Sequence, residues 1–343
     1  MAYETATEKK LLLFPGLPDR TYFAGAIVIF GLIVLVMLFA SSLFMNGQWA
    51  TYDTQRFFAM ARVIVDGATP YLDYQDPKPP LIFFVLTLPV ILGQQFLGGL
   101  LLVGMCNLVS AAVLMKIAWK FYGRFAGLLA GLLFVLNIGW AQGFFVITEP
   151  FTILFVLLAT YFAFCSKNRH YFVAGLCSGV AIGFKQYALI TVPLLVLSLY
   201  LDKELKHVPA LVAGVLLPLI AIFGAIFFIY GLDAFNASIY WSFGVAGSYI
   251  GENNVEGMTN YRTGDPLMWA ANIAMSTSMF TSIIIVAIAS AVRDRKLNTA
   301  ELYFLFSGVC FALTILIRQY LHYWVLALPF FALLCARLFR DDR

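Results

Sequence analysis

The sequence predicts an all-helical protein that crosses a membrane many times. Hydrophobic residues make up 62% of its 343 residues and charged residues only 12%, and the mean hydropathy is +0.88. Apolar stretches of about twenty residues recur along the whole chain, as they do in helical membrane proteins. These stretches are continuous, whereas the strands of a membrane barrel would alternate between apolar and polar residues.

The apolar stretches, taken in order, predict ten membrane-spanning helices. Their expected ranges are 22–45, 96–119, 125–141, 146–166, 171–184, 187–201, 208–230, 267–292, 299–317 and 319–337. The segment from 171 to 201 would form one long helix if Gly183-Phe184-Lys185-Gln186 did not interrupt it. Because a lysine is costly inside a bilayer, we expect a tight turn there between two short helices.

The positions of the basic residues support this count. If the N-terminus, residues 1–21, is cytoplasmic, only six of the 22 Lys and Arg residues lie outside: Arg56, Arg62, Lys78, Lys185, Arg262 and Arg318. Basic residues concentrate in cytoplasmic loops, so this orientation is favoured. The net charge of +4 arises from these inner loops and does not indicate binding to nucleic acid. The sequence thus predicts one multi-pass transmembrane domain, residues 1–343, in the plasma (inner) membrane of a bacterium.

Two hydrophilic stretches, 46–95 and 231–265, then lie on the outer face, and function is expected there. In the first of them, Asp53 and Thr54 favour a helix start. Apolar residues follow at helical spacing on one face: Phe57, Ala61, Ile64 and Val65. Pro79-Pro80 favours the start of a second helix over 81–92, which is too short to span a bilayer. We expect two helices lying in the membrane interface.

Five stretches of the chain carry a resemblance to a known family. They are Asp53 just after the first span, the sequence YLDYQDPKPPL at 71–81, Thr148-Glu149-Pro150, Gly183-Phe184-Lys185, and the stretch from Arg318 to Leu328, which includes His322-Tyr323. In this order they resemble the GT-C glycosyltransferases of the protein O-mannosyltransferase and aminoarabinose-transferase group. The resemblance covers roughly residues 20–200 and the last thirty.

The resemblance implies a GT-C fold and an inverting transfer of sugar from a polyprenyl-phosphate donor. The acceptor would be a lipid, a glycan or a protein on the outer, periplasmic membrane face. Two departures bear on this. Members commonly have Asp-Glu after the first helix where this chain has Asp53-Thr54. Many members also have further helices or a soluble C-terminal domain after the tenth helix, which leaves acceptor recognition open.

The chemistry implied by the resemblance assigns roles to individual residues. A hydroxyl acceptor must lose a proton as it attacks, and Asp53 is the expected catalytic base. If the acceptor were itself a phosphate, Asp53 would orient substrate instead. The leaving phosphate gains negative charge, which cations stabilise. We expect the donor phosphate to be bound by Lys78, Arg318, His322 and Lys185, and the substrates to be oriented by Asp76, Glu149 and Tyr323.

Each of these residues also has a purely structural interpretation. Asp53 would be a helix N-cap, and Asp76 and Lys78 an exposed ion pair. Arg318 and His322 are four residues apart and are therefore expected on one helix face. In the structural interpretation, the Arg318 side chain extends to the outer membrane interface and His322 packs at the helix end. Glu149, at the edge of two apolar helices, is expected to pair with Lys185 or with a substrate hydroxyl.

The sequence also allows a metal site or a transport function. Asp53, Asp76 and Glu149 would have to converge to bind a divalent cation, but no ligand spacing requires a metal, and we expect no cofactor. The five cysteines lie in apolar helices and suggest only packing. A transporter or lipid-linked-sugar flippase would carry charges through the midplane, whereas here they cluster towards one face. The 231–265 loop is either a lid, an acceptor surface or a simple outer loop.

Overall fold

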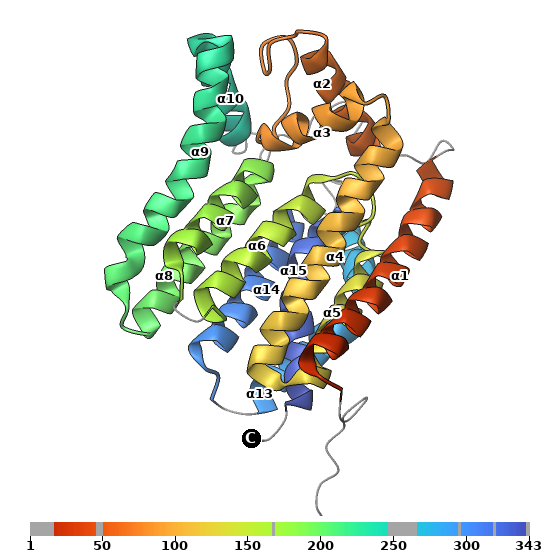
Figure 1. The fold of residues 1–343 in the computed structure, drawn as a ribbon, viewed down its shortest axis with the longest axis vertical. Helices are drawn as coiled ribbons and strands as arrows, with labels where there is room; N and C mark the ends of the chain where they lie inside the picture. The colour runs from red at the N-terminus through yellow and green to blue at the C-terminus, as the bar shows by residue number, and fades with distance from the viewer. Residues whose placement is uncertain are drawn as a thin grey trace, which may run out of the picture.

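The chain is a bundle of helices capped at one end by two short helices (Figure 1). No strand occurs in the part of the chain that the structure, a computed structural model, describes. That part comprises residues 17–45, 51–166, 169–245, 266–293, 296–317 and 320–340.

The helices in chain order are α1 (Asp19–Met45), α2 (Tyr52–Val65), α3 (Leu81–Ile91), α4 (Gln95–Tyr122), α5 (Arg124–Ile138), α6 (Thr148–Phe164), α7 (Tyr171–Phe184), α8 (Thr191–Leu201), α9 (Val208–Tyr230), α10 (Leu232–Ile239), α12 (Pro266–Ser278), α13 (Thr281–Arg293), α14 (Thr299–Ile317) and α15 (Trp324–Ala336). Shorter turns join some of them: η1 (Gln186–Ile190), η2 (Leu205–His207), η3 (Tyr240–Gly244), η4 (Leu321–Tyr323) and η5 (Arg337–Phe339).

The described helices include five segments that are long and apolar enough to cross a bilayer: Asp19–Leu43, Gln95–Tyr122, Leu205–Tyr230, Thr299–Leu316 and Leu321–Phe339. Helices α5, α6, α7 and α13, and the segment from η1 through α8, are apolar but shorter. The chain is therefore a multi-pass helical membrane protein, as predicted. Length alone does not establish the predicted number of ten spans.

One predicted span, 267–292, is divided into α12 and α13. At the break, the hydroxyls of Ser276 and Ser278 donate to the carbonyls of Ile273 and Met275, at 3.0 and 2.7 Å. Serine side chains that bond to nearby main-chain carbonyls compete with helical hydrogen bonds. This run of small hydroxyl residues accounts for the division, which hydropathy does not reveal.

The predicted turn in the 171–201 segment is confirmed. Helix α7 ends at Phe184, and Lys185 is extended, with φ −153° and ψ 124°. The chain then continues through η1 into α8. Because of this interruption, Lys185 lies between two short apolar segments and not in the middle of one long apolar helix.

Helix α15 forms the centre of the bundle, because every residue from Trp324 to Ala336 is buried. Helices α5, α13 and α14 pack around it. Helices α1 and α9, by contrast, expose many apolar side chains, among them Leu32, Phe39, Ile220 and Phe228. Helix α15 thus lies in the protein interior, whereas the exposed apolar side chains of α1 and α9 form a surface of the kind that a bilayer would cover.

Helices α7 and α9 approach each other through glycines. A Cβ atom on Gly175 would lie 2.2 Å from the carbonyl oxygen of Leu211, and one on Gly214 would lie 2.2 Å from that of Phe172. Gly175 and Gly179 follow the four-residue spacing by which small residues allow close helix packing in membranes. The two backbones are therefore in direct contact.

We expect Gly214→Ala to lower the thermal stability of the purified protein. The added methyl would meet backbone atoms, which cannot rotate away, and overpacking of this kind costs about 1–3 kcal/mol. Gly224→Ala on the same helix is the matched control, because no heavy atom lies within 4 Å of its added Cβ. Tryptophan fluorescence during heating measures both variants, and equal midpoints would contradict the close packing.

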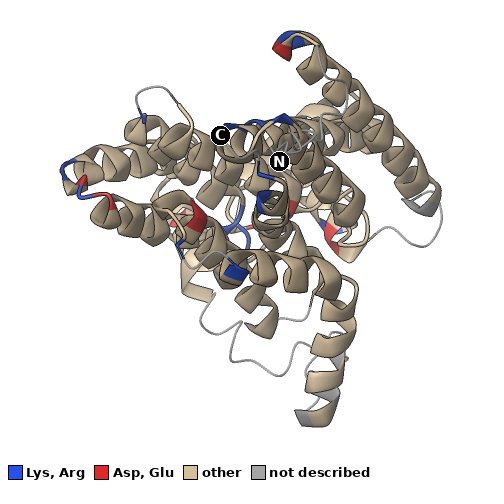
Figure 2. Ribbon diagram, turned by 90° about the horizontal axis from the view of Figure 1, so that it is seen from below, with Lys and Arg blue, Asp and Glu red and all other residues tan. Residues whose placement is uncertain are grey.

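Ion pairs gather at the end of the bundle that carries the described start of α1 and the C-terminal turn η5. They join the ends of neighbouring helices: Arg124 with Asp19, Arg169 with Asp202, and Arg337 with Glu301. A view of this end shows several Lys and Arg residues there (Figure 2). Helices α2, α3 and α10 lie at the opposite end (Figure 1). The basic loops predicted to share one side of the membrane thus share one end of the molecule.

The stretch predicted to be the first outer loop contains the two short helices that were predicted. Thr51, not Asp53, is the N-cap of α2, since its Oγ1 accepts a hydrogen bond from the Thr54 N–H at 3.2 Å. The last buried residue of α2 is Ala61, and Val65, predicted on the apolar face, is exposed. Pro80 precedes the first turn of α3, as expected for a helix that begins at a proline.

Candidate functional site

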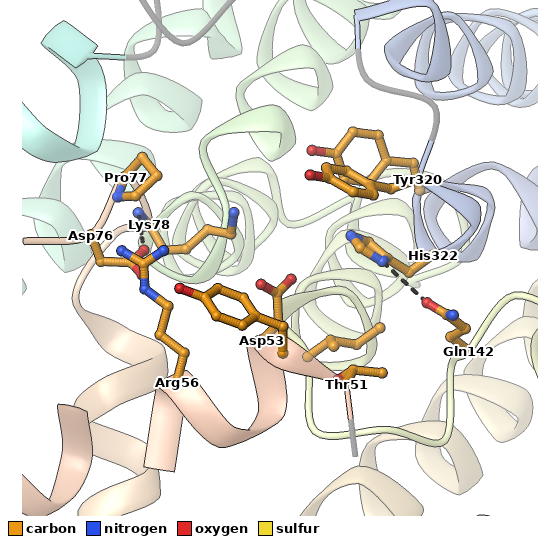
Figure 3. A pocket seen from close by; sticks show the side chains of 12 residues that line it. Thr51, Asp53, Arg56, Asp76, Pro77, Lys78, Gln142, Tyr320 and His322 are labelled. Carbon is orange, nitrogen blue, oxygen red and sulfur yellow. Dashed lines mark hydrogen bonds and ion pairs between the residues drawn. The ribbon is translucent and has the colours of Figure 1, made fainter. Parts of the chain in front are cut away.

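A polar cavity of about 270 Å³ lies at the end of the bundle covered by α2 and α3 (Figure 3). Four segments distant in sequence form its wall: the start of α2, the loop before α3, the segment between α5 and α6, and η4 with the residue before it. The lining residues are Thr51, Tyr52, Asp53, Arg56, Asp76, Pro77, Lys78, Gln142, Ile147, Tyr320, His322 and Tyr323.

Asp53 lies in the first turn of α2 and is partly exposed to this cavity. Within the described part of the chain, its carboxylate makes no hydrogen bond or ion pair. The N-cap role, which was the structural interpretation of Asp53, is filled by Thr51. Its negative charge still interacts favourably with the helix N-terminus, but the carboxylate oxygens remain open to a substrate in the cavity.

Lys78 lines the same cavity and is only partly buried (Figure 3). Its main chain is held on both sides, because its N–H donates to Asp76 Oδ1 at 2.8 Å and its carbonyl accepts from the Tyr71 hydroxyl at 2.6 Å. The prolines on both sides of it restrict the backbone further. Asp53 and Lys78 thus place a carboxylate and an ammonium on the wall of one cavity.

Asp76 is buried and forms its ion pair with Arg56 rather than an exposed pair with the Lys78 side chain. Arg56 Nε lies 2.9 Å from Asp76 Oδ2, and the Asp76 side chain is 2% exposed. Burial raises the pKa of Asp76 above its ordinary range, against the lowering effect of Lys78 and Arg56. Arg56 was not among the predicted site residues, because an arginine on the polar face of an amphipathic helix is usually just solvated.

Glu149, Lys185 and His322 form a second group directly behind the cavity wall. The Lys185 ammonium contacts Glu149 Oε1, which confirms the predicted pairing, and His322 Nε2 lies 3.5 Å from the same oxygen. The Thr148 hydroxyl donates to the other oxygen at 3.1 Å. Glu149 and Lys185 are 1% and 2% exposed, so of these three charged or titratable groups only His322 reaches the cavity.

Tyr323 connects the two groups. Its ring lies 4.1 Å from the Lys185 Nζ atom, in cation–π contact, while the residue also lines the cavity. Lys185 itself is not part of the cavity wall. The structure therefore places Lys185 and Glu149 where they support His322 and Tyr323, and their direct contact with substrate remains a prediction.

The segment from Gly139 to Ile147, between α5 and α6, contributes Gln142 to the cavity. Gln142 has a φ of +59°, in the left-handed region that residues other than glycine rarely adopt, and its Oε1 lies 3.4 Å from His322 Nδ1. Asn107 Nδ2 donates to the Gly143 carbonyl at 2.8 Å, which holds the segment in place. Strained residues of this kind concentrate at functional sites. No motif marks the segment in the sequence, where it continues an apolar stretch.

A second cavity of about 460 Å³ adjoins the first and is mainly apolar. It lies between α1 and the segment that follows α5, and it shares Thr51 and Gln142 with the polar cavity. Its other lining residues are Met37, Ala40, Ser41, Leu136, Gly139, Trp140, Phe144 and Phe145. A polar compartment at the end of the bundle therefore lies next to an apolar one beside a candidate membrane span.

Two predicted features fall outside the described residues: Arg318, and the part of the second outer loop from 246 to 265. The prediction that Arg318 and His322 share one helix face therefore stays a prediction; of the residues around it, α14 is described to Ile317 and Tyr320 is extended, with ψ 128°. His322 belongs to η4, just before α15. In the described part of the chain, no three Asp, Glu, His or Cys side chains gather as metal ligands would.

No family model matches this sequence, and no curated protein sequence matches it. Solved structures with a similar fold do match it. ArnT from Cupriavidus metallidurans bound to undecaprenyl phosphate superposes with a TM-score of 0.64 and 17% identity, over 91% of this chain and 59% of ArnT. Its apo structure gives 0.64 and 16% over the same shares. Archaeal oligosaccharyltransferase AglB from Archaeoglobus fulgidus, in complex with an inhibitory peptide and a dolichol-phosphate, gives 0.55 and 9%, over 93% and 50%.

The chain therefore has the GT-C fold that its sequence resemblance predicted. It spans about three fifths of the length of ArnT and half that of AglB. Identities this low establish the fold and leave the activity to be argued from the site itself.

Proposed function

We propose that this protein is an inverting glycosyltransferase that moves a sugar from a polyprenyl-phosphate donor to a lipid, glycan or protein acceptor. The observation that carries the proposal is the pair of Asp53 and Lys78 on one cavity wall, at one end of a GT-C bundle. A carboxylate and an ammonium in one cavity suit a reaction in which a nucleophile loses a proton while a phosphate leaves.

In the proposed reaction, the Asp53 carboxylate accepts the proton of the acceptor hydroxyl as that oxygen attacks the anomeric carbon. The bond between this carbon and the phosphate oxygen breaks from the opposite side, which inverts the configuration. Lys78 and His322 contact the departing polyprenyl phosphate, whose charge rises in the transition state. Arg318 is proposed as a further phosphate ligand, and an acceptor phosphate would need Asp53 only for orientation.

Other residues in and behind the cavity wall orient these contacts. Asp76 orients Lys78 through its main chain, and Glu149 orients His322. Lys185 holds Glu149, and the Lys185 ammonium packs on the Tyr323 ring, so Tyr323 presents a fixed face to the substrate. No metal or other cofactor is part of the proposal, since cationic side chains already face the phosphate position.

The adjoining apolar cavity supports a lipid-linked substrate. A polyprenyl phosphate has a doubly ionisable head and a hydrocarbon tail, which need a polar and an apolar environment side by side. The polar cavity meets the apolar one at Thr51 and Gln142, beside α1. A head bound near Lys78 would leave a path for the tail towards the membrane.

The proposed location is the plasma (inner) membrane, with a cytoplasmic N-terminus and the cavity on the periplasmic face. The end of the bundle with the helix-end ion pairs bears the loops that are rich in Lys and Arg. Such loops stay on the cytoplasmic side. The end that bears α2, α3 and the cavity then faces outward.

We expect Lys78→Ala to weaken the binding of undecaprenyl phosphate by about 10- to 100-fold, the range for one charge-assisted contact. The measurement is a titration of purified protein in nanodiscs, followed by native mass spectrometry. Lys120→Ala is the control, since Lys120 is exposed in the last turn of α4, far from the cavity. Equal affinities for wild type and Lys78→Ala would remove Lys78 from the donor site.

The activity itself is tested in cells that lack the protein. Loss of a transferase makes its polyprenyl-phosphate sugar accumulate and removes one glycosyl mass from an envelope lipid, glycan or protein. Mass spectrometry of extracted lipids and envelope fractions detects both changes and identifies the sugar. In proteoliposomes, a transferase moves the sugar to a new acceptor, whereas a flippase leaves the sugar on its lipid carrier. Sugar that crosses the membrane but stays on the carrier would overturn the proposal.

A further inference from the structure

We propose that Arg56, Tyr71 and Gln186 are positioning residues that clamp the segment from Gln75 to Lys78, so that the Lys78 ammonium is held in the cavity. This inference rests on the proposed function for what Lys78 binds, but the clamp itself is a property of the loop. None of the three residues was among the site residues predicted from sequence.

Arg56 connects α2 to this segment through two of its nitrogen atoms. Its Nε lies 2.9 Å from Asp76 Oδ2, and its Nη2 donates to the Gln75 carbonyl at 2.8 Å. The other oxygen of Asp76 accepts the Lys78 N–H at 2.8 Å. The planar guanidinium is suited to such a fork, which a lysine cannot reproduce. Arg56 therefore reaches the Lys78 backbone through one carboxylate.

Gln186 and Tyr71 hold the same segment from two other directions. Gln186 Nε2 donates to the Pro77 carbonyl at 2.9 Å, from the η1 turn between α7 and α8. The hydroxyl of the buried Tyr71 donates to the Lys78 carbonyl at 2.6 Å. Tyr71 has a φ of +67°, which is unfavourable for a bulky residue and persists only where the surroundings enforce it.

Side chains thus satisfy four main-chain polar groups within four residues: the carbonyls of Gln75, Pro77 and Lys78, and the Lys78 N–H. Pro77 and Pro79 have no N–H group and fix their own φ angles. A surface loop usually leaves such groups to water. Here the backbone of one lysine is immobilised by residues of α2, the loop itself and η1.

The clamp also connects the two halves of the site. Gln186 directly follows Lys185, which is anchored to Glu149 in the group that contains His322. The Pro77 carbonyl and the Glu149 carboxylate are therefore held by adjacent residues of one short segment. The two side chains proposed to contact the donor phosphate, Lys78 and His322, share this support.

Arg56 also lines the cavity, so a direct contact with phosphate is the competing explanation. The two explanations differ in what they predict for Arg56→Lys. A direct phosphate ligand would retain much of its effect, because the charge remains. A clamp would be lost, because lysine cannot bridge Asp76 and Gln75 together.

The first experiment measures the clamp without any ligand. Hydrogen exchange of the peptide 71–81, followed by mass spectrometry, is compared for wild type, Arg56→Lys, Tyr71→Phe and Gln186→Leu. Each variant is expected to speed exchange in this peptide, and Arg62→Lys, an exposed arginine on the same helix, is expected to leave it unchanged. Unchanged exchange in all three clamp variants would overturn the proposal.

The second experiment is a double-mutant cycle with undecaprenyl phosphate as the titrated probe. Arg56→Lys is expected to weaken binding about 10-fold in the wild-type background and to have no further effect in Lys78→Ala, because it acts through Lys78. Equal losses in both backgrounds would make Arg56 a phosphate ligand and overturn the positioning role. If wild type does not bind the probe, the proposed function fails, while the exchange experiment still decides the clamp.

Discussion

Asp53→Asn is expected to reduce sugar transfer by about 100-fold or more, the usual contribution of a positioned base, without loss of folding or donor binding. Asparagine has the same shape as aspartate but cannot accept the acceptor's proton. The substitution does not remove a helix cap, because Thr51 performs that role. The loss should therefore appear in kcat, with the affinity for undecaprenyl phosphate unchanged.

The measurement compares transfer by purified variants, using the donor and acceptor identified from the cells that lack the protein. Asp66→Asn, at the opposite end of α2 and highly exposed, is the matched control and should retain full activity. If Asp53→Asn also transfers at the wild-type rate, Asp53 is not the base. An effect on KM alone would instead indicate an orienting role, as expected for an acceptor that is itself a phosphate.

Much of the architecture could be predicted from sequence because hydropathy and helix signals act locally. The break at Lys185 was predictable, since a lysine within an apolar segment needs an exit from the bilayer. The helix over 81–91 was predictable from the proline pair at its start. The division between α12 and α13 was not, because serine residues interrupt a helix without lowering hydropathy much.

The site was predictable only in part, for a different physical reason. Lys78 and Asp53 stand out as charges next to apolar spans, so their residue types alone mark them. Arg56 and Gln186 are recognisable only by what they contact across the fold, at Gln75, Asp76 and Pro77. Polar residues that act on distant backbone groups leave no periodic pattern in the sequence.

Lys185→Met is expected to be the most destabilising single substitution in the site. It would leave the Glu149 carboxylate buried without its main partner, and breaking a buried ion pair in this way costs about 3–5 kcal/mol. His322, at 3.5 Å from the same oxygen, offers only a weaker contact. Thermal unfolding of the purified protein measures the loss. Arg62→Met, which breaks the exposed pair with Asp66, should cost less than about 1 kcal/mol.

The double variant Glu149→Gln with Lys185→Met separates the cost of a lone charge from the value of the pair. Removing both charges leaves a neutral amide that the Thr148 hydroxyl and His322 can still contact. The double variant should therefore be more stable than Lys185→Met alone, because replacing a buried pair by neutral groups is often nearly neutral. Its transfer activity should still be low, since His322 and Tyr323 lose the charges that orient them. Stability restored together with full activity would show that the pair serves only the fold.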